Sequence, residues 1–447
     1  MTRKFIIYTW GCQMNEEDSR QIADLLKKAG YVPGASPEEC QVAVLVTCSV
    51  RQKPENKVLS RLGELAMIKA EQNPGLIIGV YGCMAQRMGR ALRRGRPFVN
   101  CVCGTHRIDR IPLLIEKAET SPAGFFSELD IPDTVTGSPL PLPNRTERLS
   151  PSLREFVPIM FGCNNFCSYC IVPYTRGRER SRDHREIVSE ISRLAAGGTK
   201  EVTLLGQNVN SYSGGITFPE LLAEVNGIGG IERIRFTTSH PKDLSPELID
   251  AMGSLSKVSK HIHLAVQSGD NDILRAMNRR YTAEHIEELV AALRKRVAGV
   301  AVTTDFIAGF PGETEQNFEN TLRLAEQVRF DSAFMFSFNP IPGTPAASMD
   351  GQMPMKEKNK RLQRLIRLQN AITVEINSAM ADKKVRVLVH GDAAREGQRT
   401  GLTDQGKTFN FEGPQPAVGT MADAVVVRGG LYGFTGVLAR EAEGGPK

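Results

Sequence analysis

The sequence is organised around Phe161-Gly-Cys163-Asn-Asn-Phe-Cys167-Ser-Tyr-Cys170-Ile-Val-Pro-Tyr-Thr-Arg176, whose cysteines follow the spacing C-x3-C-x2-C. The apolar run before it predicts a buried strand, so the cysteines occupy the loop that follows this strand. A 4Fe-4S cluster takes one thiolate per iron, and three local thiolates leave one iron open to a small chelating molecule. Structural zinc needs four ligands, and only His184 is within reach as the fourth. The spacing therefore favours an iron–sulfur cluster over zinc, and also over three buried structural cysteines.

This motif, in a loop after the first strand of a barrel, resembles the signature of the radical S-adenosylmethionine (SAM) enzymes. The resemblance implies that Cys163, Cys167 and Cys170 hold the cluster and act in catalysis. It also implies that the open iron binds the amino and carboxylate groups of SAM.

The composition is that of an ordinary soluble globular protein of two or three domains. The 447 residues are 41% hydrophobic and 24% charged, and no apolar run approaches the roughly 18 residues of a membrane span. The N-terminus has no signal-peptide shape, which predicts a cytoplasmic protein without a membrane segment. Nine cysteines are an odd number and argue against a disulfide framework. The net charge of +6 is only a weak indication of a nucleic-acid partner.

Residues 1–118 are predicted to form an α/β domain with a parallel sheet. Three segments share one layout, an apolar strand that ends in a small residue and then a cysteine, and helical patterns lie between them. Because the carboxyl ends of parallel strands meet at one edge of a sheet, Cys12, Cys48 and Cys83 are expected at that edge. Three buried cysteines acting as small hydrophobic residues would not explain why each occupies the same place in its unit. The pattern predicts a second three-thiolate site.

The remaining cysteines are predicted to be packing residues rather than ligands. Cys40 lies in a loop, whereas Cys101 and Cys103 lie on a predicted fourth strand, 98–103, before a closing helix over 106–118. Cys103 also ends a strand, so a role as a ligand stays open for it.

The segments around the first trio, Trp10-Gly-Cys12-Gln-Met-Asn15, Thr47-Cys48-Ser and Tyr81-Gly-Cys83-Met-Ala, resemble the N-terminal domain of the methylthiotransferases. In that family the corresponding cysteines hold an auxiliary 4Fe-4S cluster. This chain has Val46 where the family usually has Asn, and the change is expected to affect hydrogen bonding around the cluster rather than its ligation.

Residues 119–150 are rich in proline and predict a linker with room for one short hairpin. Beyond it, residues 151–381 predict six strands that alternate with helices, at 156–161, 201–206, 231–238, 261–266, 301–308 and 333–338. Six such units match the partial (β/α)6 TIM-like barrel of the radical SAM enzymes, whose active site lies at the carboxyl ends of the strands.

Polar and glycine residues gather at these predicted strand ends. By resemblance to the radical SAM family they occupy the places that contact the amino group, ribose, carboxylate and adenine of SAM. Each of them has an alternative role in capping a strand or permitting a tight turn. The residues are Gly206, Gln207, Asn208, Ser239, Gln267, Ile307 and Gly309.

Five arginines lie within the ten residues 176–185, directly after the cysteine loop. A charged run is usually a solvated face, but its place beside the cluster loop favours a strip that contacts the phosphates of a nucleic acid. The proposed RNA contacts in this strip are Arg176, Arg178, Arg180 and Arg182.

Residues 382–441 follow a basic amphipathic helix over 356–382 and contain short strands with glycine-rich turns. This pattern predicts a small antiparallel β-barrel, and Gln398-Arg399-Thr-Gly with Lys407-Thr-Phe409-Asn-Phe411 resembles the RNA-binding TRAM domain. Arg399 and Lys407 are the expected RNA contacts. The two phenylalanines are either stacking platforms or core residues.

Taken over the whole chain, these segments resemble the MiaB-type tRNA methylthiotransferases. The resemblance implies conversion of N(6)-isopentenyladenosine at position 37 of tRNA to its 2-methylthio derivative. It implies two 4Fe-4S clusters, SAM as radical source and methyl donor, and the auxiliary cluster as sulfur source. The expected partners are the tRNA anticodon stem-loop and an electron donor such as flavodoxin or ferredoxin, with the enzyme a monomer. The alternatives are threonylcarbamoyladenosine at the same position, a ribosomal protein residue (RimO type) and an RNA-binding scaffold.

Overall fold

The structure is a computed structural model that describes residues 2–49, 52–131 and 151–439. The chain divides into two compact units, and each is described separately. The first, called the cysteine unit below, comprises Met1–Leu149, Met160–Arg180 and Asn339–Ala347. The second, called the barrel unit, comprises Ser150–Ile159, Ser181–Phe338 and Ser348–Lys447. Both cysteine trios belong to the cysteine unit, so the predicted barrel loop with Cys163 groups with the N-terminal α/β fold.

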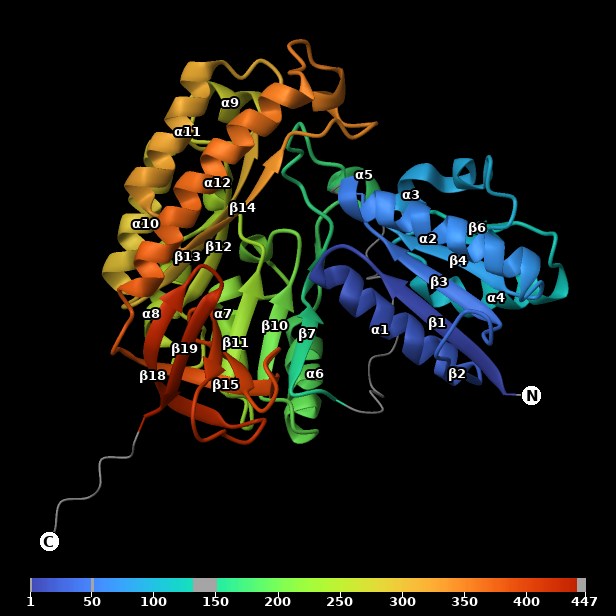
Figure 1. Cartoon of the computed structure of the whole chain (residues 1–447), viewed down its shortest axis with the longest axis horizontal. Helices are drawn as coiled ribbons and strands as arrows, with labels where there is room; N and C mark the ends of the chain where they lie inside the picture. The colour runs from blue at the N-terminus through green and yellow to red at the C-terminus, as the bar shows by residue number, and fades with distance from the viewer. Residues whose placement is uncertain (1, 50–51, 132–150, 440–447) are drawn as a thin grey trace, which may run out of the picture. The chain divides into compact units, whose positions relative to one another are not determined.

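A parallel six-stranded sheet in the order β2-β1-β3-β4-β5-β6 forms the centre of the cysteine unit (Figure 1). The predicted strands occur in it, together with two short edge strands that were not predicted. The strands are β1 (Arg3–Thr9), β2 (Tyr31–Pro33), β3 (Val42–Thr47), β4 (Ile77–Gly82), β5 (Cys101–Cys103) and β6 (Phe126–Glu128). The helices are α1 (Gln13–Lys28), α2 (Gln52–Glu71), α3 (Cys83–Met88), α4 (Ile111–Thr120) and α5 (Val172–Thr175).

Helices cover both faces of this sheet. Apolar residues of α1 and α4 pack on one face, and those of α2 and α3 pack on the other. Strands β3 and β4 are buried along their whole length, which explains why their sequences are continuously apolar rather than alternating. The carboxyl ends of the central strands are thereby fixed side by side.

The predicted linker begins later than expected. Residues Phe126–Glu128 form β6, which pairs in parallel with β5 and extends the sheet. A parallel partner cannot arise from a hairpin, so the expected hairpin is not found among the described residues of the linker. Residues 132–150 of the linker lie outside the described part of the chain.

Two parallel three-stranded sheets, β7-β10-β11 and β12-β13-β14, form the centre of the barrel unit. A bridge between Ser239 and Leu264 lies where the two sheets meet, so the expected (β/α)6 order is present. The strands are β7 (Arg154–Pro158), β10 (Glu201–Leu205), β11 (Arg233–Thr237), β12 (His261–Gln267), β13 (Ala301–Ala308) and β14 (Ser332–Ser337), and a short pair is β8 (Met160–Phe161) with β9 (Arg180–Ser181).

Helices lie along the outer side of these sheets, as Figure 1 shows for α10, α11 and α12 beside β12–β14. None of the helices in the described ranges is long and apolar enough to cross a membrane. The helices are α6 (His184–Ala196), α7 (Phe218–Asn226), α8 (Pro246–Ser254), α9 (Asn271–Ala276), α10 (Ala283–Arg296), α11 (Glu315–Val328) and α12 (Met355–Ser378).

The C-terminal strands form a closed barrel in the order β15-β16-β17-β19-β18. The prediction of a purely antiparallel barrel is wrong at one seam, because β17 pairs with β19 in parallel where the barrel closes. Phe409 and Phe411 are fully buried in its core, so they pack the barrel and do not stack on a base. The strands are β15 (Lys384–Asp392), β16 (Arg399–Thr403), β17 (Thr408–Phe411), β18 (Met421–Gly430) and β19 (Gly433–Leu438).

A buried ion cluster joins this C-terminal barrel to the amino ends of β10 and β11. Glu201 accepts from Arg154 Nε at 2.7 Å and from Arg235 Nε at 3.0 Å. Arg233 Nη1 donates to Glu201 at 3.3 Å and to the Leu402 carbonyl at 2.7 Å. Burial alone would raise the pKa of Glu201, but the three arginine charges outweigh burial and lower the pKa to about 2.

Glu201→Gln is expected to destabilise the barrel unit by roughly 3 kcal/mol at pH 7, because it leaves buried arginine charges without their partner. The folded-state pKa lies below the ordinary value, so the contribution of Glu201 is complete above about pH 5 and is lost as the pH falls toward 2. Chemical denaturation of both proteins at pH 7 and pH 3 measures this difference. A gap in unfolding free energy that does not shrink at pH 3 would contradict the assignment.

Candidate active site

Three cysteines lie just past the carboxyl ends of neighbouring strands in the cysteine unit. Cys12 follows β1 and stands at the amino end of α1, Cys48 directly follows β3, and Cys83 directly follows β4 as the first residue of α3. Strand β3 is paired with both β1 and β4. The predicted convergence on one sheet edge is therefore what the strand order produces.

Two glycines show how closely these segments approach one another. Gly11 has φ +132°, and a Cβ atom there would lie 2.7 Å from the Cys48 Cβ. Gly82 has φ +106°, and a Cβ atom there would lie 2.5 Å from the Thr47 carbonyl oxygen. Both positions therefore require glycine, for conformation and for space. The residues before Cys12 and Cys83 both pack against the end of β3.

The described residues contain no group of three or more His, Cys, Asp or Glu side chains placed to hold a single metal ion. A 4Fe-4S cluster does not need such a group, because each of its thiolates binds a different iron and the thiolates stand apart. The donor set of the edge, three cysteines on three strand ends, fits that requirement.

The cysteines outside the trios occupy packing positions. Cys101 and Cys103 lie in the core between the sheet and α4, and burial raises the pKa of the Cys101 thiol to about 12. Cys103 Sγ donates to the Arg107 carbonyl at 2.9 Å. Cys40 is fully buried. These surroundings support the interpretation as small hydrophobic residues.

The loop with the second trio is folded back on itself. The backbone N–H of Cys163 donates to the Gly177 carbonyl at 3.2 Å, and that of Cys170 donates to the Cys167 carbonyl at 2.9 Å. Cys163 and Cys167 are buried, whereas Cys170 is half-buried. A compact loop of this kind presents three thiols from one short segment, as the spacing predicted.

An aromatic pair with a cation lies on the same loop. The rings of Phe166 and Tyr174 meet edge to face with centroids 6.1 Å apart. The guanidinium of Arg178 lies 4.3 Å above the Phe166 ring, and Tyr174 is 46% exposed. The loop therefore carries an exposed aromatic surface with a positive charge beside its cysteines.

The arginine strip does not form one solvated face. Arg176 is 4% exposed, and its Nη2 pairs with Asp18 at 3.0 Å. Arg182 is 9% exposed and pairs with Glu190 at 2.9 Å. The prediction of phosphate contacts by Arg176 and Arg182 is wrong for this structure, since both guanidinium groups are buried in ion pairs. Nothing in the local sequence marks their partners.

The other proposed RNA contacts differ in accessibility. Arg178 is exposed, and Arg180 Nη2 donates to His106 Nδ1 at 2.7 Å. Burial and the charge of Arg180 lower the pKa of His106 to about 4, so this ring is neutral at pH 7 and accepts. Lys407 is largely buried and pairs with Asp331 at 3.0 Å, which argues against a phosphate contact. Arg399 is half-exposed and pairs with Asp392.

The barrel unit collects polar groups at the carboxyl ends of its strands, where SAM contacts were predicted. Gln207 Oε1 after β10, Ser239 Oγ after β11 and Asp305 Oδ1 on β13 are buried, and the described residues offer them no hydrogen-bond partner. Unsatisfied buried polar atoms are costly, and a polar ligand would satisfy them. These atoms fit a ligand such as SAM. Ile307 lies on the same face of β13 as Asp305.

Three other predicted SAM contacts instead stabilise loops or strand ends of the fold. Asn208 donates to Asp243 at 2.7 Å and to Ser211 at 2.9 Å, so its amide holds the loop after β10. Gly206 pairs with β11 through its backbone. Gly309 has φ +76° and faces Lys358 so closely that no side chain fits. For Gly206, Asn208 and Gly309 the structure supports the alternative role, in a turn or at a strand end.

Two polar residues near these strand ends were not among the predicted contacts. His240 Nε2 is buried without a partner in the described structure, and burial with the Arg279 charge lowers the pKa of His240 to about 2. Asp305 pairs through Oδ2 with His263 Nε2 at 3.3 Å. Gln267, which was predicted, takes a positive φ of 76° at an irregularity between β12 and β13. His240 follows the end of β11 and Asp305 lies within β13, two residues before the predicted contact Ile307, and these places are the signals that point to them.

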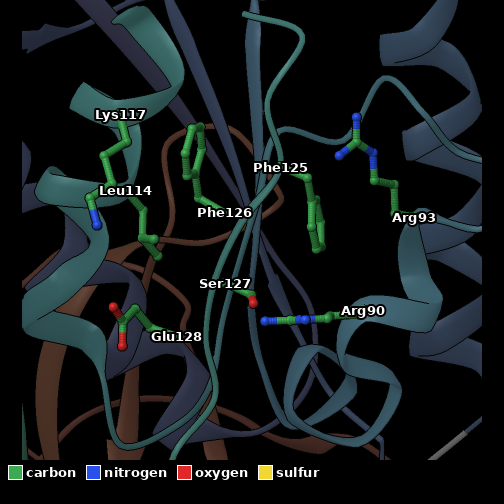
Figure 2. A pocket seen from close by; sticks show the side chains of 8 residues that line it. All are labelled: Arg90, Arg93, Leu114, Lys117, Phe125, Phe126, Ser127 and Glu128. Atoms are coloured by element: carbon green, nitrogen blue, oxygen red, sulfur yellow. The ribbon is translucent and has the colours of Figure 1, made fainter. Parts of the chain in front are cut away.

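A cavity of about 340 Å³ has no cysteine of either trio in its lining, and Figure 2 shows its walls. Phe126 and Glu128 point to one side of the edge strand β6, toward α4, while Phe125 and Ser127 point to the other side. The side chains that line the cavity therefore lie on both sides of an edge strand and do not converge on one point. This makes the cavity a poor candidate for the active site. Its lining residues are Arg90, Arg93, Leu114, Lys117, Phe125, Phe126, Ser127 and Glu128.

Comparison with known protein families identifies two matches along the chain. Residues 157–325 match the Radical SAM superfamily, and residues 4–104 match the family described as Uncharacterized protein family UPF0004. The first match contains the second cysteine trio and the carboxyl ends of β7, β10, β11, β12 and β13. The second match contains the first trio.

Near full-length relatives carry the name tRNA-2-methylthio-N(6)-dimethylallyladenosine synthase. The protein of that name from Moorella thermoacetica is 46% identical over 435 residues, which are 95% of this chain and 96% of that protein. The one from Carboxydothermus hydrogenoformans is 44% identical over 98% of this chain and 99% of that protein. A Clostridium botulinum relative is 42% identical over 97% and 96%.

Solved structures share the fold at low sequence identity. The radical SAM methyltransferase TsrM from Kitasatospora setae matches with a TM-score of 0.55 and 15% identity, over 78% of this chain and 74% of that chain. The cobalamin-dependent SAM radical enzyme OxsB matches with a TM-score of 0.50 and 12% identity, over 81% and 56%. These two likenesses concern the fold alone.

Proposed function

The chain belongs to the family of tRNA-2-methylthio-N(6)-dimethylallyladenosine synthases, and we propose that it adds a methylthio group to carbon 2 of N(6)-isopentenyladenosine at position 37 of tRNA. As a radical SAM enzyme it uses a 4Fe-4S cluster and SAM. The single observation that carries the proposal is the adjacency of the three strand ends with Cys12, Cys48 and Cys83. A radical SAM enzyme that only cleaved SAM would have no use for this second thiolate set.

The residues divide the work between two places in the cysteine unit. Cys163, Cys167 and Cys170 would hold the radical SAM cluster, and Cys12, Cys48 and Cys83 would hold an auxiliary cluster. When bound, the clusters and SAM supply the radical, the sulfur and the methyl group. The backbone hydrogen bonds of the loop 161–176 and the close approach of Gly11 to Cys48 hold the thiols in place before a cluster binds. In the barrel unit Gln207, Ser239 and Gln267 remain the proposed SAM contacts.

The exposed groups on the cysteine loop suit an RNA base. Tyr174 with Phe166 offers an aromatic surface for stacking, and Arg178 offers a positive charge for a phosphate or for the base itself. In the C-terminal barrel Arg399 is the remaining candidate for a phosphate contact. These features support tRNA, through its anticodon stem-loop, over a protein substrate.

The remaining expectations belong to the same proposal. The N-terminal α/β fold extends through β6 (Phe126–Glu128), residues 151–381 are the radical SAM core, and residues 382–441 are a TRAM-like RNA-binding barrel. The enzyme acts as a monomer in the cytoplasm, where tRNA is found, and takes electrons from a flavodoxin or ferredoxin.

Expression of this chain in a bacterial strain that lacks its own methylthiotransferase is expected to restore 2-methylthio-N(6)-isopentenyladenosine in tRNA. Nucleoside mass spectrometry of the purified tRNA measures the product. Cys40→Ala is the matched control, because it removes a buried thiol outside both trios and should restore the product as the native chain does.

Two outcomes would replace the proposed substrate. Restoration of only the 2-methylthio derivative of threonylcarbamoyladenosine would assign the chain to the other tRNA base. A methylthio group on a ribosomal protein, with unmodified tRNA, would assign it to the protein-modifying class.

A further inference from the structure

The Arg176 side chain is buried in the cysteine unit and is held from two sides. Its Nη2 atom donates to Asp18 Oδ2 at 3.0 Å and to Asn15 Oδ1 at 3.1 Å. Asn15 is itself fixed, because its Nδ2 donates to the Trp10 carbonyl at 2.7 Å. Asn15 and Asp18 both lie in the first two turns of α1, the helix that begins directly after Cys12. Arg176 is therefore held by two residues of the helix that begins directly after Cys12, a member of the auxiliary trio.

The guanidinium charge reaches two thiols of that trio. Arg176 Nη2 and Cys12 Sγ share Asn15 Oδ1 as their acceptor, at 3.1 Å and 3.9 Å. Burial lowers the pKa of Arg176, but Cys83, Asp18 and Cys12 raise it and so favour its charged form. Burial matters here, because charges that are removed from water are screened far less than charges on the surface. Arg178, only two residues further along the chain, is exposed and lies over the Phe166 ring instead. The same loop thus carries one buried and one solvated cation.

We propose that Arg176 is a positioning residue that raises the reduction potential of the auxiliary cluster at Cys12, Cys48 and Cys83, and that Asp18 offsets part of its charge. The inference rests on the proposed function, since it requires that cluster. Reduction adds negative charge to a cluster, so a nearby fixed cation favours the reduced form and a nearby carboxylate disfavours it. Removal of the two groups should therefore move the potential in opposite directions.

The test is a redox titration of the auxiliary cluster followed by electron paramagnetic resonance. The full chain carries Cys163→Ala, Cys167→Ala and Cys170→Ala, so that only one cluster contributes to the signal. Arg176→Gln is expected to shift the midpoint potential to more negative values, and Asp18→Asn is expected to shift it to more positive values. Arg176→Lys keeps the charge and should restore most of the potential. Arg178→Gln removes a solvated charge from the same loop and should leave the potential unchanged.

A negative shift for Arg176→Gln together with a positive shift for Asp18→Asn supports the proposal, and shifts in the reverse directions overturn it. Equal potentials in all variants, or shifts of the same sign for Arg176→Gln and Asp18→Asn, overturn it and indicate a purely structural ion pair. If the Arg176→Gln variant fails to retain iron, the other two variants decide. A midpoint potential that is more positive in Asp18→Asn and little changed in Arg176→Lys supports the proposal. Any other result for these two variants overturns it. Absence of iron from the parent variant would instead contradict the proposed function, so the two failures are distinguishable.

Discussion

Replacement of Cys163, Cys167 and Cys170 by alanine is expected to abolish reductive cleavage of SAM while roughly half of the iron remains bound. The three thiols come from one short loop, and the other trio comes from three strand ends, so loss of the first set leaves the second complete. Iron analysis after anaerobic reconstitution and chromatographic detection of 5′-deoxyadenosine measure the two quantities.

Cys40→Ala provides the control, because Cys40 is a buried cysteine that belongs to neither trio. It should keep the full iron content and SAM cleavage. Loss of all iron from the triple variant would mean that the six cysteines share one cluster, and the assignment of two sites would be wrong.

The matching replacement of Cys12, Cys48 and Cys83 is expected to stop sulfur insertion entirely while SAM cleavage persists. These thiols lie on the sheet edge of the α/β fold, and the loop 161–176 keeps its own hydrogen bonds without them. The variant should again keep about half of the iron. Mass spectrometry of the tRNA nucleosides and detection of 5′-deoxyadenosine in the same reaction give both readouts.

A variant of this second trio that still formed the methylthio product at the native yield would contradict the role of the auxiliary site. A variant that lost SAM cleavage as well as sulfur insertion would contradict the independence of the two sites. Only the separation of the two activities agrees with the proposed division of labour.

Much of the architecture is predictable because its signals are local. The spacing of Cys163, Cys167 and Cys170 lies within one loop, and the repeated strand–cysteine layout of the N-terminal region depends only on short apolar runs. Parallel strands align their carboxyl ends by geometry, so the convergence of distant cysteines also follows from these runs. Glycine at positions 11 and 82 is visible in the sequence, but its reason, the close approach to the end of β3, is not.

The predictions that are wrong concern side chains and strands whose partners are distant along the chain. The arginine run after the cysteine loop has the same composition whether its members are solvated or buried. The structure alone shows that Arg176 pairs with Asp18 and that Lys407 pairs with Asp331. The parallel seam between β17 and β19 and the added strand β6 likewise depend on which edges meet after folding.

The sequence by itself determined the two cysteine trios, the alternation of strands and helices and the order of the predicted domains, since these depend on spacing and periodicity within short segments. Tertiary structure decided which charges are buried and which face solvent. Arg176 and Asp18 are 158 residues apart. Only the burial of both in one compact unit turns a member of a charged run into a fixed cation that shares the acceptor Asn15 with Cys12. The physical reason is that a side chain's electrostatic role depends on its desolvation and its neighbours, which are set by the folded chain.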